Sequence, residues 1–387
     1  MREAITIVGG GLAGLTAAIA CAEGGASVVL HEAHHTLGGR ARSTPAPYVA
    51  NEGVHALYAD GLPWRWLDER RLVRPYAPPR PGHLLRARFR RDGRLTGRPP
   101  AALLRMAARR GLRAPVEEDF GSWVTRHFGE EAARVAAGAT GVVTYDADPG
   151  RLSAAFVWER LLRVAAPRYP AVRYLVGGWG RMIDRMAAYA RDLGVRVETG
   201  SRVDRLPDGL VIVSTSLDAA RGLLDDDSLR WESGRGVLLD LGLRAHPRDL
   251  FLVSDLDEGG FLERYSLPDR SVAPRGESLV QLELPMRPGE AKGEALARLE
   301  RIADLALPGW RDRVTWRRES VAAGRTGALD LPGASWRDRP AVERGDGVWL
   351  AGDQVAAPGL LAEVSVNSAL AAARAALASR SRPRPAA

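Results

Sequence analysis

The stretch Ala4-Ile-Thr-Ile-Val-Gly-Gly-Gly-Leu-Ala-Gly14 decides the fold of this chain. A short apolar run ends in glycines, and a helical composition follows from 12 to 23, which predicts a buried strand, a tight turn and a helix. Gly9, Gly11 and Gly14 have the spacing Gly-x-Gly-x-x-Gly. In that motif the first glycine permits the turn, the second admits a pyrophosphate, and the third lets the helix pack closely on the strand.

The residues that follow extend this unit into a β-α-β dinucleotide site. Leu12 and Ala13 open the helix, whose free N–H groups and dipole favour an anion. A second apolar run, 27–30, leads to Glu32. An acid at this position is expected to accept hydrogen bonds from ribose hydroxyls and to disfavour a 2′-phosphate, so NADP is not expected here.

The next residues, Glu32-Ala-His-His-Thr-Leu-Gly-Gly-Arg40, carry a family resemblance. They resemble the glycine-doublet extension of the flavin amine oxidase and phytoene desaturase superfamily. The resemblance implies FAD as cofactor, with Ala33 beside the ribose-binding acid and with Gly38 and Gly39 against the phosphates. Arg40 would add a positive charge with phosphate-matching geometry.

Two distant segments resemble further flavin motifs of the same superfamily. In Gly194-Val-Arg-Val-Glu-Thr-Gly-Ser-Arg-Val203, the resemblance implies that Val203 meets the adenine through its backbone. In Trp349-Leu-Ala-Gly-Asp353, Gly352 leads to Asp353, which would bind the ribityl chain. Gly359 and Leu360 then open a long helix, whose N-terminus would face the flavin pyrimidine and favour the anionic reduced ring.

The fold class that we expect is α/β, with two intertwined domains, since 387 residues exceed one ordinary core. A discontinuous Rossmann-like FAD domain would comprise 1–62, 171–225 and 340–387. An α+β substrate domain would comprise 63–170 and 226–339. Helical periodicity over 120–128 and 152–164 predicts a cap that is mostly helical. Short apolar runs between 236 and 284 predict a mixed or antiparallel sheet, one face of which would carry Glu263, Tyr265, Gln281 and Glu283 toward the pocket or toward solvent.

Candidate catalytic residues lie in Asn51-Glu-Gly-Val-His-Ala-Leu-Tyr58. In related flavoproteins this stretch passes the flavin ring, so His55 would exchange a proton with the substrate and Tyr58 would form a wall of its site. The alternative is that His55 only satisfies hydrogen bonds and Tyr58 belongs to the core. Many amine oxidases of this superfamily hold a water with a lysine. Lys292 is the only lysine here, and it lies in a segment that reads as an exposed helix, which puts amine oxidation in doubt.

The function that we expect first is removal of hydride from a small, lipophilic metabolite by a phytoene desaturase-like dehydrogenase or oxidase. Oxygen or a quinone would accept the electrons. The alternatives are a flavin amine oxidase, a redox-neutral flavin isomerase, and an escort-like binding protein without redox chemistry. Flavin colour and its bleaching by substrates would separate these readings.

Composition bears on partners and location. The net charge is +8 and is carried by arginines, but they occur throughout the chain without a nucleic-acid motif, so no nucleic acid is expected. The segment 99–113 reads as a basic amphipathic helix, which either contacts a membrane surface weakly or packs as part of the cap. Cys21 is the only cysteine, and no metal site is expected. No apolar run suits a bilayer span and no signal peptide is recognisable, so we expect a cytoplasmic protein.

Overall fold

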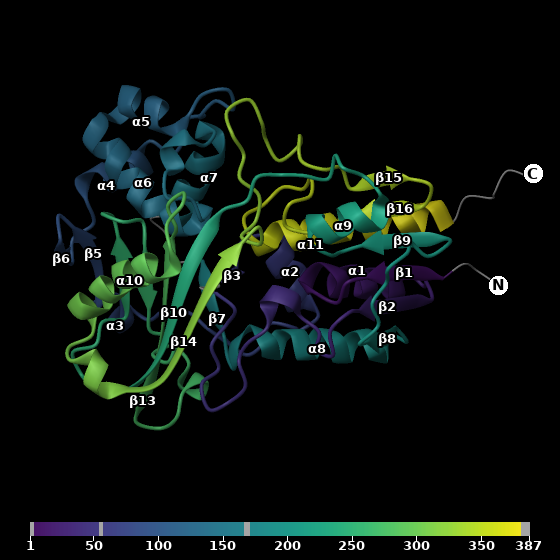
Figure 1. Cartoon of the computed structure of the whole chain (residues 1–387), viewed down its shortest axis with the longest axis horizontal. Coiled ribbons are helices and arrows are strands. Elements are labelled where there is room, and N and C mark those ends of the chain that lie inside the picture. Colours follow the sequence, from purple (N-terminus) through teal and green to yellow (C-terminus); the bar gives the residue numbers. More distant parts are fainter. Residues whose placement is uncertain (1–3, 54–56, 166–170, 381–387) are drawn as a thin grey trace, which may run out of the picture.

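The computed structural model describes residues 4–53, 57–165 and 171–380. A six-stranded sheet with its helices lies on the right of Figure 1, and a seven-stranded sheet with a helical cap lies on the left. Segments from the beginning, middle and end of the chain contribute to the six-stranded sheet. The α/β fold class is confirmed, and the sites discussed below lie where the two sheets face each other.

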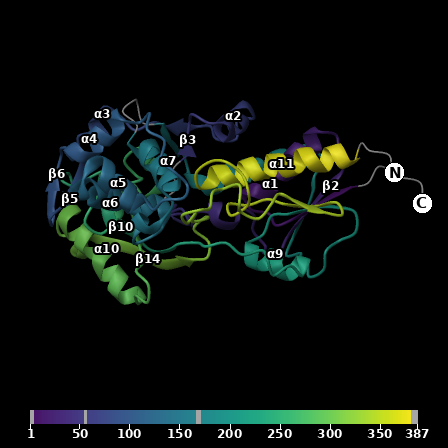
Figure 2. The ribbon, with the colours of Figure 1, turned by 90° about the horizontal axis from the view of Figure 1, so that it is seen from above.

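The six-stranded sheet has the order β15-β16-β9-β1-β2-β8 and is parallel except for the edge pair β15–β16. Its strands are β1 (Ile5–Val8), β2 (Val28–Glu32), β8 (Arg196–Thr199), β9 (Leu210–Val213), β15 (Glu343–Gly345) and β16 (Val348–Leu350). Helices cover both faces, which explains the nearly continuous apolar runs of the central strands. Helices α1 (Leu12–Glu23), α8 (Gly178–Asp192) and α11 (Ala362–Arg380) lie on one face and α9 (Leu217–Leu224) on the other (Figure 2).

The seven-stranded sheet has the order β14-β10-β13-β12-β11-β5-β6. Its strands are β5 (Ala87–Arg91), β6 (Arg94–Thr96), β10 (Arg235–Arg244), β11 (Leu252–Asp255), β12 (Phe261–Glu263), β13 (Glu277–Pro285) and β14 (Val314–Ala323). The sheet is mixed, because β5 pairs with β11 in parallel and the other pairs are antiparallel. Helix α10 (Lys292–Ala306) covers one face, where Leu239 and Leu282 pack against Leu299. Because side chains alternate along a strand, the neighbouring residues point to the opposite face.

The cap consists of four helices around one apolar core, and it lies at the upper left of Figure 1. Its helices are α4 (Ala101–Ala108), α5 (Phe120–Phe128), α6 (Glu130–Thr144) and α7 (Ala154–Val164). Helix α6 packs directly on the turn after β11: a Cβ on Gly138 would lie 2.2 Å from the Leu256 carbonyl oxygen, and one on Gly141 2.8 Å from that of Gly259. Only glycine permits such a close approach of two backbones.

Short elements complete the chain. They are α2 (Leu62–Glu69), α3 (Pro81–Leu84), the three-stranded sheet of β3 (Leu57–Tyr58), β7 (Val172–Leu175) and β4 (Tyr76–Ala77), and the 3-10 turns Gly39–Ala41, Pro149–Arg151, Arg270–Val272 and Trp310–Arg313. The region from 63 to 170 is mostly helical, as expected, and it also contributes β5 and β6 to the seven-stranded sheet. One detail of the prediction is wrong. The helix expected over 99–113 spans only 101–108, and the chain turns at Arg109, just before Gly111.

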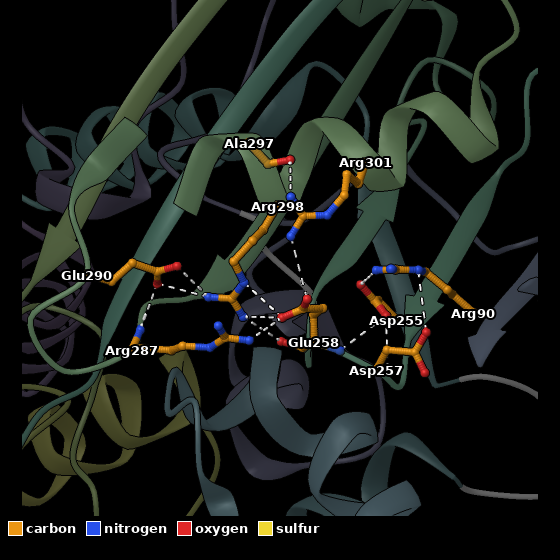
Figure 3. Close-up of polar contacts among 9 residues, drawn as sticks. All are labelled: Arg90, Asp255, Asp257, Glu258, Arg287, Glu290, Ala297, Arg298 and Arg301. Atoms are coloured by element: carbon orange, nitrogen blue, oxygen red, sulfur yellow. Dashed lines mark hydrogen bonds and ion pairs between the residues drawn. The ribbon is translucent and has the colours of Figure 1, made fainter. Parts of the chain in front are cut away.

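Ion pairs fix the β11–β12 turn to the sheet and to α10 (Figure 3). Glu258 accepts from Arg287 at 2.7 Å and from Arg298 at 2.8 Å. Arg298 also pairs with Glu290 at 2.9 Å, and both of these side chains are buried. This cluster holds the turn on which α6 rests.

Candidate active site

The glycine-rich turn between β1 and α1 has the geometry of a phosphate cradle. A Cβ on Gly14 would lie 1.8 Å from the Gly9 carbonyl oxygen, so helix and strand touch there. Gly9 has a φ of +106°, which side chains rarely adopt. A Cβ on Gly11, by contrast, would meet no atom within 4 Å. The turn is therefore tight at Gly9 and Gly14 and open at Gly11, where Leu12 and Ala13 begin the helix and a phosphate can approach.

Glu32 ends β2 beside this turn. Its side chain is buried, and the carboxylate accepts from the Gly10 amide at 2.7 Å and from the His34 amide at 2.9 Å. A carboxylate has about four acceptor positions, so capacity for ribose hydroxyls is left. Gly10 was not singled out from the sequence, but a Cβ there would lie 2.4 Å from the Leu37 side chain. Ala33 follows Glu32 and is exposed.

The glycine doublet lies against the glycine-rich turn. The Gly38 amide donates to the Gly10 carbonyl at 2.8 Å, and a Cβ on Gly39 would lie 3.5 Å from the Gly11 Cα. Both doublet residues have positive φ, +109° at Gly38 and +53° at Gly39. The sequence therefore needs glycine at these positions for conformational reasons as well as for close approach.

Arg40 and Asp353, which are 313 residues apart in the chain, form a bidentate ion pair. The guanidinium donates at 2.5 Å to one carboxylate oxygen and at 2.8 Å to the other. Partial desolvation opposes the charge on Arg40, whose side chain is 43% exposed, but the neighbouring Asp353 outweighs this effect and raises the pKa of Arg40. The pair joins the glycine doublet to the C-terminal motif, the two segments that the family resemblance assigned to one flavin.

The C-terminal motif leads into α11. The Gly352 amide donates to the Ser368 hydroxyl at 2.9 Å, which anchors the turn on that helix. Helix α11 begins at Ala362 rather than at Leu360, because Leu361 has a φ of +51° and interrupts the helix. The Leu360 amide donates to Glu363 at 3.0 Å, and Gly359 has a φ of +116°. Gly359 and Leu360 thus precede the helix N-terminus instead of forming its first turn.

The segment that carries Val203 follows β8 and is held next to the end of β2. The Ser201 amide donates to the Glu32 carbonyl at 2.8 Å, and the Ser201 hydroxyl bonds to His31 Nδ1 at 2.8 Å. Val203 itself is half-buried beside the small core under α9. Its backbone therefore follows a residue that is bonded to Glu32, the acid predicted to bind the ribose, as contact with an adenine would require.

These segments fit the FAD that the family resemblance implies. Open space at Gly11 suits a pyrophosphate, Glu32 suits a ribose, and the Arg40–Asp353 pair lies farther along, toward α11. Phosphate binding at a helix N-terminus needs free amides and close backbone approach, and both are present here.

The opposite wall is the uncovered face of the seven-stranded sheet. Asp240, Gln281 and Glu283 are buried and point away from α10, as does Glu263. They lie on inner strands of the sheet, so the solvent-facing alternative is excluded for them. Gln281 Nε2 donates to Asp240 at 2.8 Å and to the Asn51 carbonyl at 3.1 Å, which joins this face to the segment that follows the glycine doublet.

Glu263 is surrounded by aromatic side chains. Tyr174 donates its hydroxyl proton to this carboxylate, and the ring of Tyr265 lies 5.9 Å from that of Tyr174. Burial raises the pKa of Glu263 to about 7, although the hydrogen bond from Tyr174 and the nearby Tyr265 hydroxyl act in the opposite direction. A carboxyl group with such a pKa can hold or release a proton near neutral pH.

Tyr58, one of the two candidate catalytic residues, lies in β3 and is buried. Burial raises the pKa of Tyr58 to about 12, so its hydroxyl stays protonated. The Arg163 guanidinium lies 4.5 Å from the ring centroid of Tyr58 and also pairs with Glu363 at 2.7 Å. Tyr58 thus lies near the N-terminal end of α11. His55, the other candidate, lies outside the described residues, and its role stays a prediction.

Tyr145 is a site residue that the sequence reading missed. It follows α6 with a φ of +57°. A Cβ built on Gly236 would lie 3.3 Å from the ring of Tyr145 and 3.5 Å from Glu283 Oε1, so the two side chains lie close together over this glycine. Burial raises the pKa of Tyr145 well above its ordinary value, and Glu283 contributes while Arg40 opposes. Tyr145 therefore lies beside Glu283 on the sheet face and within electrostatic reach of Arg40. Gly234 and Gly236 could have indicated this contact, since glycines in a strand often mark a place where another part of the chain approaches closely.

Lys292 lies at the start of α10, on the covered side of the sheet, and pairs with Glu319 at 3.2 Å. It is therefore remote from the facing walls of the site.

Within 4–53, 57–165 and 171–380, no group of three or more His, Cys, Asp or Glu side chains is placed to hold a metal ion. None of the helices in these ranges is long and apolar enough to cross a bilayer.

Comparison with known proteins agrees with this geometry. Residues 7–69 match the family model of the NAD(P)-binding Rossmann-like domain. No curated protein matches the sequence of the chain.

Several solved structures share the fold over nearly their whole length. An oxidoreductase from Methanosarcina mazei is 16% identical, with a TM-score of 0.76 over 96% of this chain and 100% of its own. Cyclohexylamine oxidase from Brevibacterium oxydans is 16% identical, with a TM-score of 0.69 over 99% and 100%. Reduced UDP-galactopyranose mutase is 15% identical, with a TM-score of 0.65 over 86% and 84%. The chain therefore has the fold of these proteins, with a Rossmann-like dinucleotide-binding unit at its N-terminal end.

Proposed function

We propose that the chain is an FAD-dependent oxidoreductase that removes hydride from a small metabolite. The observation that carries this proposal is a set of contacts: Glu32 accepts from the glycine-rich turn, the glycine doublet packs on that turn, and Arg40 after the doublet pairs with Asp353. These residues come from both ends of the chain, and each offers the chemistry that one part of FAD needs. When bound, the flavin supplies the hydride acceptor, and the protein supplies orientation and electrostatics.

In this proposal Glu263 on the sheet face, together with Tyr58 from β3 and Tyr145 after α6, orients the substrate and holds protons. Tyr58 and Tyr145 have protonated hydroxyls that can donate hydrogen bonds, since the pKa of each is raised. Glu263 can accept a proton near neutral pH. His55 remains proposed as a further proton donor or acceptor. Burial of all three described side chains keeps water away from their hydrogen bonds.

The first substrate class is a small, lipophilic metabolite, oxidised with oxygen or a quinone as electron acceptor. Its support is the aromatic cluster around Glu263, in which Tyr174 lies 6.2 Å from Phe251 and 5.9 Å from Tyr265 between ring centroids. Aromatic side chains provide a large apolar contact surface.

An amine is the second substrate class, and buried carboxylates favour it. Glu263 and Glu283 lie on the sheet face that looks toward the dinucleotide site. A buried carboxylate is stabilised by a cation, and aromatic rings also attract an ammonium group. The remote position of Lys292 weighs against a lysine-assisted mechanism but leaves amine binding open.

The test is the visible spectrum of the purified protein before and after anaerobic addition of substrates. We expect a flavin band near ~450 nm whose chromophore is released by denaturation. Bleaching by an isoprenoid would support the first substrate class, and bleaching by an amine the second. Turnover without net bleaching or oxidation would indicate a redox-neutral isomerase. A protein that stays colourless after addition of FAD would contradict the proposal and favour an escort-like binding function.

A further inference from the structure

The positive charge of the molecule is concentrated in one segment. Residues 76–113 contain eleven arginines and one aspartate, a net charge of +10, whereas the whole chain has +8. Arginines occur elsewhere too, but acidic residues outnumber the basic ones outside this segment by two. The rest of the molecule is therefore nearly neutral.

The segment forms one end of the molecule. It contains α3, the β5–β6 hairpin at the edge of the seven-stranded sheet, and α4. These elements lie together in both views, at the end opposite the six-stranded sheet (Figures 1 and 2). The charge is thus localised in space as well as in sequence.

Most of these arginines have no acidic partner. Arg90 pairs with Asp255 at 2.7 Å, and Arg91 pairs with Glu131 at 2.9 Å. The other nine form no ion pair within the described part of the chain; they are Arg80, Arg86, Arg88, Arg94, Arg98, Arg105, Arg109, Arg110 and Arg113. The arrangement contrasts with Figure 3, where every arginine that is drawn pairs with a carboxylate.

Exposed leucines accompany the unpaired arginines. Leu85 is 78% exposed and Leu84 44% exposed at the end of α3, and Leu104 is 57% exposed on α4. Leu103 and Met106 on the same helix are buried in the cap core. Helix α4 therefore packs through one side and presents a leucine and arginines on the other.

A cleft of about 530 Å³ lies between the end of α4 and the end of α5. Arg105 and Arg109 line it together with His127 and Phe128. The cleft is wide enough for a small anionic group, and two of its cations have no acidic partner.

We infer that the segment 76–113 docks on the surface of a bilayer that contains anionic phospholipids. Unpaired arginines attract the headgroups, and leucines that would cost free energy in water can enter the apolar boundary. Arginines alone could also bind the phosphates of a nucleic acid, but the exposed leucines beside them have no role on a phosphate backbone and favour a bilayer. This inference concerns a surface distinct from the active site and does not depend on the proposed reaction.

The experiment is co-sedimentation of the full-length protein with vesicles. Vesicles of phosphatidylcholine alone are compared with vesicles that also contain phosphatidylglycerol, at low and at high salt. We expect binding to the anionic vesicles only, with loss at high salt because the charges are screened. Equal binding to both vesicle types, or no binding to the anionic ones at low salt, would overturn the inference.

Two double variants locate the surface. Arg109→Gln with Arg110→Gln should lower partitioning by more than tenfold, since each basic residue contributes about fivefold. Leu84→Ser with Leu85→Ser should also lower partitioning severalfold.

The matched controls are Leu305→Ser, which changes a 41% exposed leucine on α10, and Arg275→Gln with Arg374→Gln, which changes exposed arginines outside the segment. Controls that lose as much binding as the test variants would overturn the inference. A competition with duplex DNA gives a further outcome. If the DNA displaces the protein from vesicles, and the Leu84→Ser, Leu85→Ser variant binds that DNA as well as wild type does, the surface binds nucleic acid and the inference is overturned.

Discussion

The two walls of the candidate active site are built in different ways. The dinucleotide side uses backbone: Gly9, Gly11 and Gly14 shape the turn, and Glu32 holds that turn by accepting from a main-chain amide. The sheet side uses buried side chains instead, such as Glu283 on a central strand. A site made of backbone is sensitive to added atoms, whereas a site made of buried carboxylates is sensitive to protonation and charge.

The largest expected effect comes from adding one carbon to the backbone wall. Gly14→Ala places a Cβ 1.8 Å from the Gly9 carbonyl oxygen and 2.6 Å from the Ser214 hydroxyl. Relief requires α1 to move away from β1 in the centre of the core, so we expect a loss of about 3 kcal/mol or more in the free energy of unfolding. Chemical denaturation of the cofactor-free protein measures this loss.

Gly11→Ala is the matched control for this change. Its Cβ meets nothing within 4 Å, so the free energy of unfolding should stay within about 0.5 kcal/mol of wild type. The same Cβ occupies the space proposed for the pyrophosphate, so FAD affinity should fall more than tenfold in a fluorescence titration. Unchanged FAD affinity would show that the phosphates do not lie at this turn.

The sheet wall should instead respond to pH through Glu263. Its pKa is about 7 in the native protein, against an ordinary value of 4.5, because the carboxyl group is buried. The native state therefore keeps a proton that the unfolded chain releases, and stability is lost as pH rises from about 4.5 to about 7. At about 1.4 kcal/mol per pKa unit, the loss reaches roughly 3 kcal/mol.

Denaturation curves at several pH values measure this dependence, and Glu263→Gln provides the comparison. The variant has no carboxyl group at this position and should lose less stability over the same interval. Parallel curves for the two proteins would mean that Glu263 ionises normally, and its proposed role as a proton acceptor near neutral pH would fail.

A smaller effect is expected where the two halves of the FAD motif meet. Asp353→Asn keeps the shape of the side chain but removes the charge that pairs with Arg40 at 2.5 Å and 2.8 Å. Hydrogen bonds to charged groups contribute about 1.5–3 kcal/mol, so FAD should bind at least tenfold more weakly. Arg40→Gln combined with Asp353→Asn should weaken binding by less than the sum of the single changes. Additive losses would indicate that the two residues act independently.

The same difference between the walls explains what the sequence could predict. Gly9 to Gly14 and Glu32 lie within a short stretch, so their spacing predicted the turn, the β-α-β unit and the acid at its end, and the family resemblance added the glycine doublet. The helices and apolar strands were also predictable, because periodicity is a local property. The helix over 99–113 was overestimated, since its arginines fit a helical pattern but Gly111 follows the turn at Arg109.

The sheet wall could not be predicted in the same way, because it arises from pairing between distant strands. Glu263 faces Gln281 across β12 and β13, and Asp240 faces Gln281 across β10 and β13. The sequence showed that these polar residues alternate with apolar ones along their strands. It could not show which face of the sheet α10 covers, because that depends on the register of the assembled sheet. Tyr145 was missed because its place depends on the contact of α6 with the β11–β12 turn.

The smallest effect is expected from replacing Lys292, the only lysine that could play the part that a lysine plays in many amine oxidases of the resembled superfamily. Lys292 is 47% exposed in its side chain and pairs with Glu319 at 3.2 Å on the α10 side of the sheet. An exposed pair contributes at most about 1 kcal/mol, so Lys292→Met should leave unfolding nearly unchanged. Turnover of any substrate that bleaches the flavin should also be unchanged, because α10 and its core separate this lysine from Glu263 and Glu283. A tenfold loss of amine turnover with an unchanged flavin spectrum would mean that the lysine reaches the flavin in the working enzyme. The exposed helix would then have to move, and the placement of Lys292 outside the proton-handling residues would be wrong.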